Sequence, residues 1–367
     1  MKKLFFSAVL VVLCISLFAQ VTPYGSVRTS YWYEIQDEDA NLFNSGVKES
    51  RMNMNFGLQP NSRFGVDFKT EGWNSKVEMG LDNSNRVSVR HAWVKRQFDN
   101  WALSFGQMED GMYLQADQVW GGDLNLNGYG VVYGGRNPAI RADFCEGFYA
   151  ALITPVRNRL PVGIQNDVDF LIPKINLGWN GAAGKVTLKP SAMLQMYSYN
   201  KDFIRTNDPG SNDVDETVLS WLVALTADYK DNAFKARLHL NFGMNTGNMG
   251  FAGSNNTVRW GVKQGQTDPE IFDTSTLGVM GQFGFDLNDS MYLGAGAGYS
   301  LSSNDLWDND DARMGLFLQS VMSGWGFKFI PEVGMMMEMD NIRNDFQGQT
   351  VARGSMMYFG TQLRFDF

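Results

Sequence analysis

The sequence predicts an all-β protein, a transmembrane antiparallel β-barrel of about 16 strands. Three observations lead to this fold class. Long segments alternate apolar and polar residues with a period of two, which is the period of a β-strand. The links between these segments alternate between short and long. The chain also begins with an export signal, and no later stretch is apolar enough to form a membrane helix.

The alternation is clearest in residues 233–245. From Phe234 to Met244 every second residue is apolar, and the residues between them are polar, charged or glycine. Strands of soluble proteins usually end after about 5–6 residues, whereas a tilted membrane-crossing strand needs about 9–11. Residues 353–367 repeat the pattern up to the terminal Phe367. In a membrane barrel the apolar face contacts lipid and the polar face lines a wet interior.

The first 19 residues have the order of a cleaved signal peptide: Lys2 and Lys3, an apolar run over residues 4–18, and the small residue Ala19. Cleavage leaves residues 20–367 as one barrel domain. Its only cysteine is Cys145, so no intrachain disulfide is possible. Loss of the two lysines leaves 29 of the 31 basic residues against 39 acidic ones. This acidic balance argues against a nucleic acid partner.

Taken in order, the alternating segments give one expected strand each. The second segment is interrupted at Gln59-Pro60-Asn61, which we interpret as a bulge in one long strand because proline within sheets occurs at bulges and edges. A turn at this point, or a strand within residues 129–136, would change the count to 14 or 18. The expected strands are 22–35, 51–68, 73–82, 86–98, 101–107, 137–144, 148–155, 167–179, 185–199, 216–230, 233–245, 275–287, 290–301, 312–322, 325–339 and 353–367.

The links sort by parity. Links after even strands are short, at residues 71–72, 99–100, 145–147, 180–184, 231–232, 288–289 and 323–324. Links after odd strands are long, at residues 36–50, 108–136, 156–166, 200–215, 246–274, 302–311 and 340–352, with 83–85 as the exception. Short periplasmic turns and long outer loops are typical of bacterial outer-membrane barrels. We therefore expect the protein in the cell outer membrane, in contact with its lipid.

Charged residues on the predicted inner face suggest a pore lining. Strand parity turns basic side chains inward, and the long third loop over residues 108–136 carries carboxylates. If this loop folds inward, a transverse field across the gap would screen solutes by charge. The simpler alternative is that these charges are the solvated face of a water-filled barrel. The residues concerned are Arg28, Arg63, Lys76, Arg90, Arg141, Glu109, Asp110, Asp117 and Asp123.

Residues 62–107 resemble the early strands of the Gram-negative outer-membrane diffusion porins. The similar runs are SRFGVDFKTEGWNSKVEMGL, SVRHAWV and WALSFGQ, together with Tyr24-Gly25 and the terminal Phe367. The resemblance implies a barrel of about 16 strands, commonly a homotrimer, whose third loop narrows the pore. It also places Arg90 at the position of a constriction arginine. The third loop here lacks the Pro-Glu-Phe-Gly-Gly motif of the enterobacterial members.

Aromatic and histidine residues complete the expectations. Strand parity places Trp73, Trp93, Trp101, Trp179, Trp221 and Trp325 on the outer face, as in an interfacial girdle. Trp32 should face the lumen and Trp120 lies in the third loop, where they could stack on a sugar or, as we favour, fill space. His91 is expected outside and His239 inside, so no catalytic arrangement converges and we expect no enzyme.

No cofactor or metal is expected. The acidic segment with Asp305, Asp308, Asn309, Asp310 and Asp311 carries the oxygen ligands that calcium prefers, but its spacing matches no known calcium loop, so we interpret it as a solvated loop.

The sequence thus favours a porin for passive diffusion of small hydrophilic solutes and ions. Two alternatives remain: a channel selective for a sugar or an anion, and a closed surface barrel whose outer loops bind a partner.

Overall fold

The computed structural model describes residues 20–81, 86–112, 115–156, 168–199, 217–251, 256–261, 270–306, 310–339, 342–344, 349–351 and 353–367. The expected signal peptide at residues 1–19, the turn at 83–85 and the loop at 200–215 lie outside the described residues. No helix within the described ranges is long and apolar enough to span a membrane.

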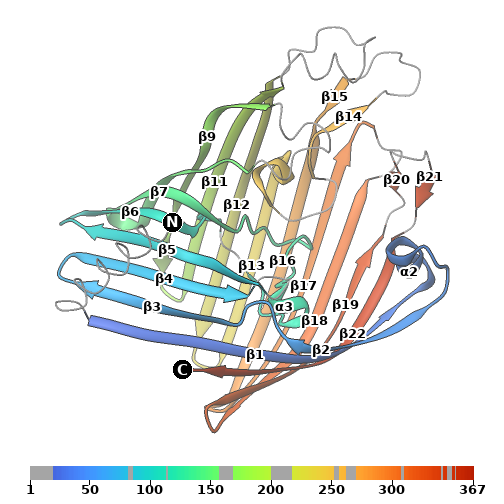
Figure 1. The fold of residues 1–367 in the computed structure, drawn as a ribbon, viewed down its shortest axis with the longest axis horizontal. Coiled ribbons are helices and arrows are strands. Elements are labelled where there is room, and N and C mark those ends of the chain that lie inside the picture. The colour runs from blue at the N-terminus through green and yellow to red at the C-terminus, as the bar shows by residue number, and fades with distance from the viewer. Residues whose placement is uncertain are drawn as a thin grey trace.

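The described strands form one closed antiparallel β-barrel of 16 membrane-crossing strands, as expected (Figure 1). The main sheet contains β1 (Gln20–Gln36), β2 (Arg51–Leu58), β3 (Arg63–Thr70), β4 (Trp73–Leu81), β5 (Val87–Gln97), β6 (Trp101–Glu109), β7 (Arg136–Phe144), β8 (Phe148–Ile153), β9 (Val168–Trp179), β10 (Gly181–Ala183), β11 (Val186–Tyr199), β12 (Thr217–Asp231), β13 (Phe234–Met244), β16 (Thr274–Asn288), β17 (Met291–Asn304), β18 (Asp311–Gly324), β19 (Phe327–Glu338) and β22 (Gly354–Asp366).

Two crossings are each built from a pair of these segments. β2 and β3 both pair with β1, and β9 and β10 both pair with β11. The interruption between β2 and β3 falls at Gln59-Pro60-Asn61, as predicted from the proline. The chain therefore continues one strand through a local break there instead of turning back.

The barrel closes where its first and last strands meet. β1 pairs with β22 from Ser26 opposite Asp366 to Gln36 opposite Met356. Short turns and the end of β22 lie at one end of the barrel, which we call the turn end, and the long links lie at the other, the loop end (Figure 1). Neighbouring crossings are thereby hydrogen-bonded to one another around the barrel, as a lipid-spanning sheet requires, although β2 pairs only with β1 among the described residues.

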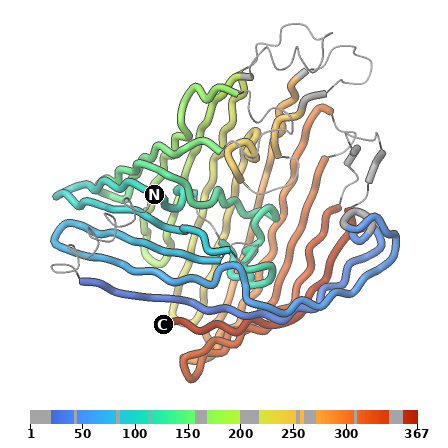
Figure 2. Tube along the Cα trace, viewed as in Figure 1, coloured from blue at the N-terminus to red at the C-terminus, as the bar shows by residue number. Residues whose placement is uncertain are grey.

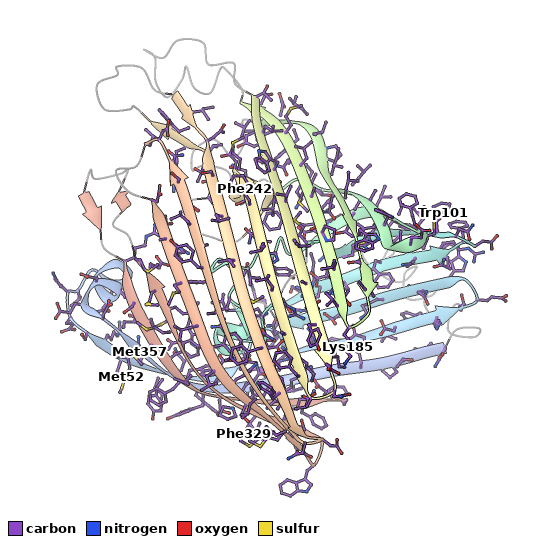
Figure 3. The ribbon with its side chains drawn as sticks, turned by 180° about the vertical axis from the view of Figure 1, so that it is seen from behind. Met52, Trp101, Lys185, Phe242, Phe329 and Met357 are labelled. Atoms are coloured by element: carbon purple, nitrogen blue, oxygen red, sulfur yellow. The ribbon has the colours of Figure 1, made fainter. Side chains whose placement is uncertain are left out.

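The two faces of the barrel have the chemistry that the alternation predicts. Large apolar side chains such as Phe242, Phe329 and Met357 project outward (Figure 3). On the inner face, side chains such as Gln195, Ser220 and Gln362 are buried although they are polar. This inside-out distribution is the opposite of that in a soluble sheet protein and fits a lipid-facing exterior.

A β-bulge in β5 reverses the predicted inward or outward orientation of the residues that follow it. Glu78 of β4 is opposite His91 and Met79 is opposite Val89, which leaves Arg90 as an extra residue. Arg90 and His91 therefore both point inward, and parity is reversed after them. The expectation that His91 and Trp93 face outward was wrong: His91 lies near Glu109, and Trp93 packs against the interior cluster.

The loop end carries small elements that alternation did not predict. They are α2 (Glu38–Ser45), the hairpin β14 (Arg259–Gly261) with β15 (Glu270–Phe272), and the hairpin β20 (Ile342–Asn344) with β21 (Gln349–Val351). A short helix, α3 (Trp120–Asp123), belongs to the link between β6 and β7. In Figure 2 this green link leaves the wall and runs into the middle of the barrel.

Asp37 fastens the closing strands at the loop end. One carboxylate oxygen caps α2 by accepting from the Ala40 amide at 2.8 Å, and the other accepts from the amide and hydroxyl of Ser355, each at 2.7 Å. Burial by itself raises the pKa of Asp37, but the hydrogen bonds from Ala40 and Ser355 outweigh burial and hold that pKa below its usual value. The ionised form is therefore favoured by the fold.

We predict that Asp37→Asn lowers the free energy of unfolding by about 1.5–3 kcal/mol at pH 7, because charge-assisted hydrogen bonds across the closing strands are lost. The depressed pKa means that this stabilisation is present above pH about 4 and disappears as the pH falls further. Urea titrations in lipid vesicles at pH 7 and pH 3 measure both effects. Glu38→Gln, an exposed neighbour, is the control, and equal stability of wild type and D37N at pH 7 would contradict the assignment.

Candidate pore lumen

The link between β6 and β7 folds onto the inner face of the barrel. Its tight turn at α3 uses Gly121 and Gly122, both with positive φ, where side chains are disfavoured. Further along, Gly130 lies so near the opposite wall that a Cβ there would come within 2.1 Å of the Val279 carbonyl oxygen. Glycine thus allows the backbone of this link to lie directly against the wall.

Glu332 of β19 is the main anchor of this link. Its two carboxylate oxygens accept from the backbone amides of Val119 and Trp120, at 2.8 and 3.0 Å. The Tyr358 hydroxyl donates to the same carboxylate at 3.1 Å, and Gln118 donates to that hydroxyl at 2.8 Å. Wall side chains thereby replace the water that these loop amides would otherwise need.

A second anchor lies at Asp117. The Asp117 amide donates to Gln282 of β16 at 2.8 Å, and Gln282 donates back to the Asp117 carboxylate at 2.5 Å. Gln319 of β18 donates to the Asp117 carbonyl at 2.9 Å. The link is therefore held by β16, β18 and β19 together, on the side of the lumen opposite to its origin at β6.

Trp32 and Trp120 are both packed against Tyr358. Trp120 stacks on the Tyr358 ring with a centroid separation of 4.7 Å, and its indole donates to Glu34 at 2.9 Å. Trp32 meets the same tyrosine edge-on at 5.9 Å and is buried. Both rings fill space, which is the role that the sequence favours, and neither offers an open stacking surface.

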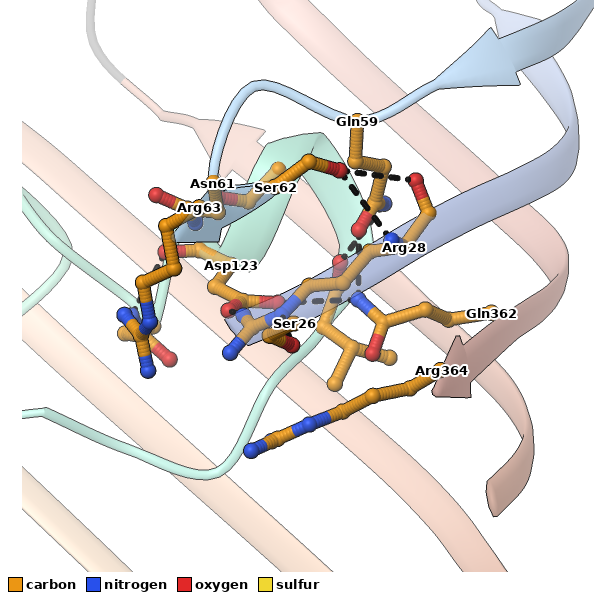
Figure 4. Close-up of polar contacts among 12 residues, drawn as sticks. Ser26, Arg28, Gln59, Asn61, Ser62, Arg63, Asp123, Gln362 and Arg364 are labelled. Atoms are coloured by element: carbon orange, nitrogen blue, oxygen red, sulfur yellow. Dashed lines mark hydrogen bonds and ion pairs between the residues drawn. The ribbon is translucent and has the colours of Figure 1, made fainter. Parts of the chain in front are cut away.

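Asp123, at the end of α3, pairs with Arg28 of β1 and accepts from Gln362 of β22 at 2.9 Å (Figure 4). Asn61, from the break between β2 and β3, donates to the Gly122 carbonyl in the same region. The loop thus also touches the closing strands. Arg28 is only 3% exposed, and its positive charge is largely neutralised by Asp123.

The other two predicted loop carboxylates do not line the cavity. Glu109 pairs with Arg136 at 2.9 Å. Asp110 is completely buried beside Lys174 of β9, with 3.4 Å between the charged atoms. Burial raises the pKa of Asp110 to about 6, although Lys174 acts in the opposite direction. Both acids therefore form ion pairs at the base of the link. Neither lines the cavity, so these two residues do not provide the transverse field that was expected between the loop and the wall.

The predicted basic residues divide into two groups. Arg28, Arg63 and Arg90 line the central cavity, with Arg90 paired to Glu78 at 2.7 Å. Lys76 pairs with Asp67 at 3.4 Å, and Arg141 pairs with Asp143 at 2.7 Å, both near the turn end. Strand parity did not identify Lys95 as an inward residue. The bulge at Arg90 turns it inward, where its ammonium nitrogen lies 2.8 Å from an Asp143 carboxylate oxygen.

The central cavity has a volume of about 850 Å³, and cations outnumber carboxylates in its lining. At roughly 30 Å³ per molecule this volume would hold on the order of 30 waters. Four carboxylates line it: Asp117, Asp123, Asp228 and Asp286. Nine cations line it: Arg28, Arg63, Arg90, Arg136, Lys189, Lys235, Arg237, Lys328 and Arg364.

Within the described ranges, no group of three or more His, Cys, Asp or Glu side chains is placed to hold a metal ion. Two members of the acidic outer segment, Asp308 and Asn309, lie outside those ranges, so its calcium alternative is untested.

No family model and no curated protein matches the chain. The outer membrane channel DcaP of Acinetobacter baumannii is 16% identical over 96% of this chain and 98% of its own, with a TM-score of 0.70. The chain has the fold of the outer-membrane porins.

Two further matches have the same architecture. OmpT, an outer membrane protein of Vibrio cholerae described in a trimer form, is 15% identical over 95% of this chain and 100% of its own, with a TM-score of 0.58. OmpF of Salmonella typhi, in complex with daunomycin, is 12% identical over 95% and 97%, with a TM-score of 0.54. At these identities the likeness establishes the fold alone.

We predict that Glu332→Ala detaches the link between β6 and β7, which we call the inner link, and enlarges the pore. The substitution leaves the buried Val119 amide and the partly buried Trp120 amide without acceptors, and an unsatisfied buried amide costs about 1–3 kcal/mol. The expected result is a larger and noisier single-channel conductance in planar lipid bilayers. Glu71→Gln, in an exposed short turn, is the control. Unchanged conductance in E332A would show that the link does not limit the pore.

Proposed function

We propose that this protein is an outer-membrane porin through which small hydrophilic solutes and ions diffuse passively, with a preference for anions. The barrel fold satisfies the backbone inside lipid, and a polar lumen provides the path. No step in such transport needs a catalytic residue, because the driving force is the concentration difference of the solute.

The charge of the cavity supports the anion preference. Nine cations against four carboxylates leave an excess of five positive charges in the lining, whereas the whole chain carries a net charge of −8. Positive charge in a narrow space with low-dielectric walls concentrates anions and repels cations. The acidic residues that set the net charge of the chain lie largely elsewhere.

The other candidate functions have less support. A sugar channel would be expected to display aromatic rings to its solute, and Trp32 and Trp120 are packed against Tyr358. The function of a closed surface barrel does not require a basic lining around a cavity of this size.

The ionic preference is tested by the zero-current potential across a planar bilayer that separates two KCl concentrations. We expect a potential whose sign shows chloride to be more permeant than potassium, because the excess lining charge is positive. The preference should weaken as ionic strength rises and screening increases. A potential with the sign of potassium selectivity would contradict the proposal.

The proposal includes a homotrimer, as the resemblance implies. Its support is that OmpT of Vibrio cholerae, which has the same barrel fold, is described in a trimer form. Light scattering of the detergent-solubilised protein, corrected for bound detergent, should give the mass of three copies. The mass of one copy would contradict the trimer.

A further inference from the structure

Charged side chains form a ring around the interior at the turn end. Every member lies within the four strand residues next to a short turn or next to the end of β22. We call this set the turn-end ring. Its five carboxylates and eight cations, linked by ion pairs, are Asp67, Asp143, Asp228, Asp286, Asp366, Lys76, Lys95, Arg141, Lys189, Lys235, Arg237, Lys328 and Arg364.

Three carboxylates of the ring are each shared by two cations. Asp228 accepts from Lys189 at 2.7 Å and from Arg237 at 2.5 Å. Asp366 accepts from Lys328 at 3.1 Å and from Arg364 at 2.7 Å. One negative charge cannot neutralise two positive ones, so each of these groups keeps an excess of one positive charge.

The third such group is Asp143 with Lys95 and Arg141, at 2.8 and 2.7 Å. The remaining two carboxylates each pair with a single lysine: Asp67 with Lys76 and Asp286 with Lys235. The ring as defined therefore carries an excess of three positive charges, distributed around the wall.

The excess charge is most accessible at this end, although Arg63, which shares Glu78 with Arg90, is also 29% exposed. The Lys189 and Lys328 side chains are 40% and 41% exposed, whereas Arg28 and Arg90, near the inner link, are 3% and 8% exposed and already paired with carboxylates. A solute in the lumen can therefore reach the lysines of the ring but not the charges of those two arginines.

The inner link rests directly on the loop-end side of the ring. Arg237 donates to the Gln115 carbonyl, and Tyr292, whose ring lies 5.2 Å from the Lys235 ammonium, donates to Asp117 at 3.3 Å. A bulky anion that arrives from the loop end meets the link before it meets the ring. From the turn end, the ring comes first.

We propose that the turn-end ring is a binding site for multivalent oxyanions, meaning solutes with several carboxylate or phosphate groups, and that they reach it from the turn end. An oxyanion with several charges can contact more than one of the groups with excess positive charge at once. Guanidinium and ammonium groups retain free N–H donors after one ion pair, so they can bind a second oxyanion. The proposal rests on the proposed function only in requiring a water-filled lumen.

The test is block of single-channel current by sodium tripolyphosphate added to one side of a planar bilayer. The side that carries the turn end is identified through Cys145, an exposed free thiol in the turn between β7 and β8, with a membrane-impermeant thiol reagent. We expect reversible block from the turn-end side and an onset of block at least about tenfold slower from the loop-end side, because the inner link obstructs the path to the ring from there.

Lys189→Gln combined with Lys328→Gln removes two of the excess charges and leaves Asp228 and Asp366 paired one to one. This variant should bind tripolyphosphate about tenfold or more weakly. The matched control, Lys48→Gln with Lys185→Gln, removes the same charge outside the ring and should bind like wild type. Equally fast onset of block from both sides, no block, or equal loss in both variants overturns the ring site while leaving an anion-preferring channel intact. Absence of any conductance would instead overturn the proposed function.

Discussion

Backbone hydrogen bonding in a medium without water is the constraint on which this structure depends. Inside hydrocarbon every amide and carbonyl needs a partner within the protein, and a closed sheet provides one. The pairing of β1 with β22 completes the ring of strands. Even the break before β3 keeps its backbone groups paired: the Gln59 amide donates to the Arg28 carbonyl at 2.8 Å, and the Leu81 amide donates to the Ser62 carbonyl at 3.0 Å.

The same constraint explains why the inner face is polar. It must hold water, and it must also satisfy the backbone of a link that leaves the wall between β6 and β7. Glu332 accepts from two of its amides, Asn241 donates to the Gly130 carbonyl at 2.8 Å, and Ser300 donates to the Gly128 carbonyl at 2.9 Å. The polar side chains at alternate strand positions thus hold the inner link by hydrogen bonds as well as line the lumen.

The strands were predictable because each one carries its own signal. Period-two alternation specifies which residues face lipid, and link lengths specify which end of the barrel each turn occupies. The break at Pro60 was predictable for the same local reason. The bulge at Arg90 was not, because nothing in SVRHAWV marks an extra residue, and one residue reverses the facing of all that follow.

The interior was less predictable, because its contacts join residues far apart in the chain. Asp110 looked like a lumen carboxylate, but it pairs with Lys174 in a fully buried position. Alternation identified inward cations such as Arg28, Arg63 and Arg141, but it could not show that Lys189 and Arg237 share Asp228. Pairing of this kind depends on register between strands, and it decides where positive charge remains available to a solute.

The central claim is that this barrel encloses an open, water-filled path. The most direct test is the current across a planar lipid bilayer after addition of the purified, folded protein. An open path should give discrete and stable conductance steps. Silence from protein shown by circular dichroism to be folded and β-rich would contradict it and would favour a closed barrel that binds a partner through its outer loops.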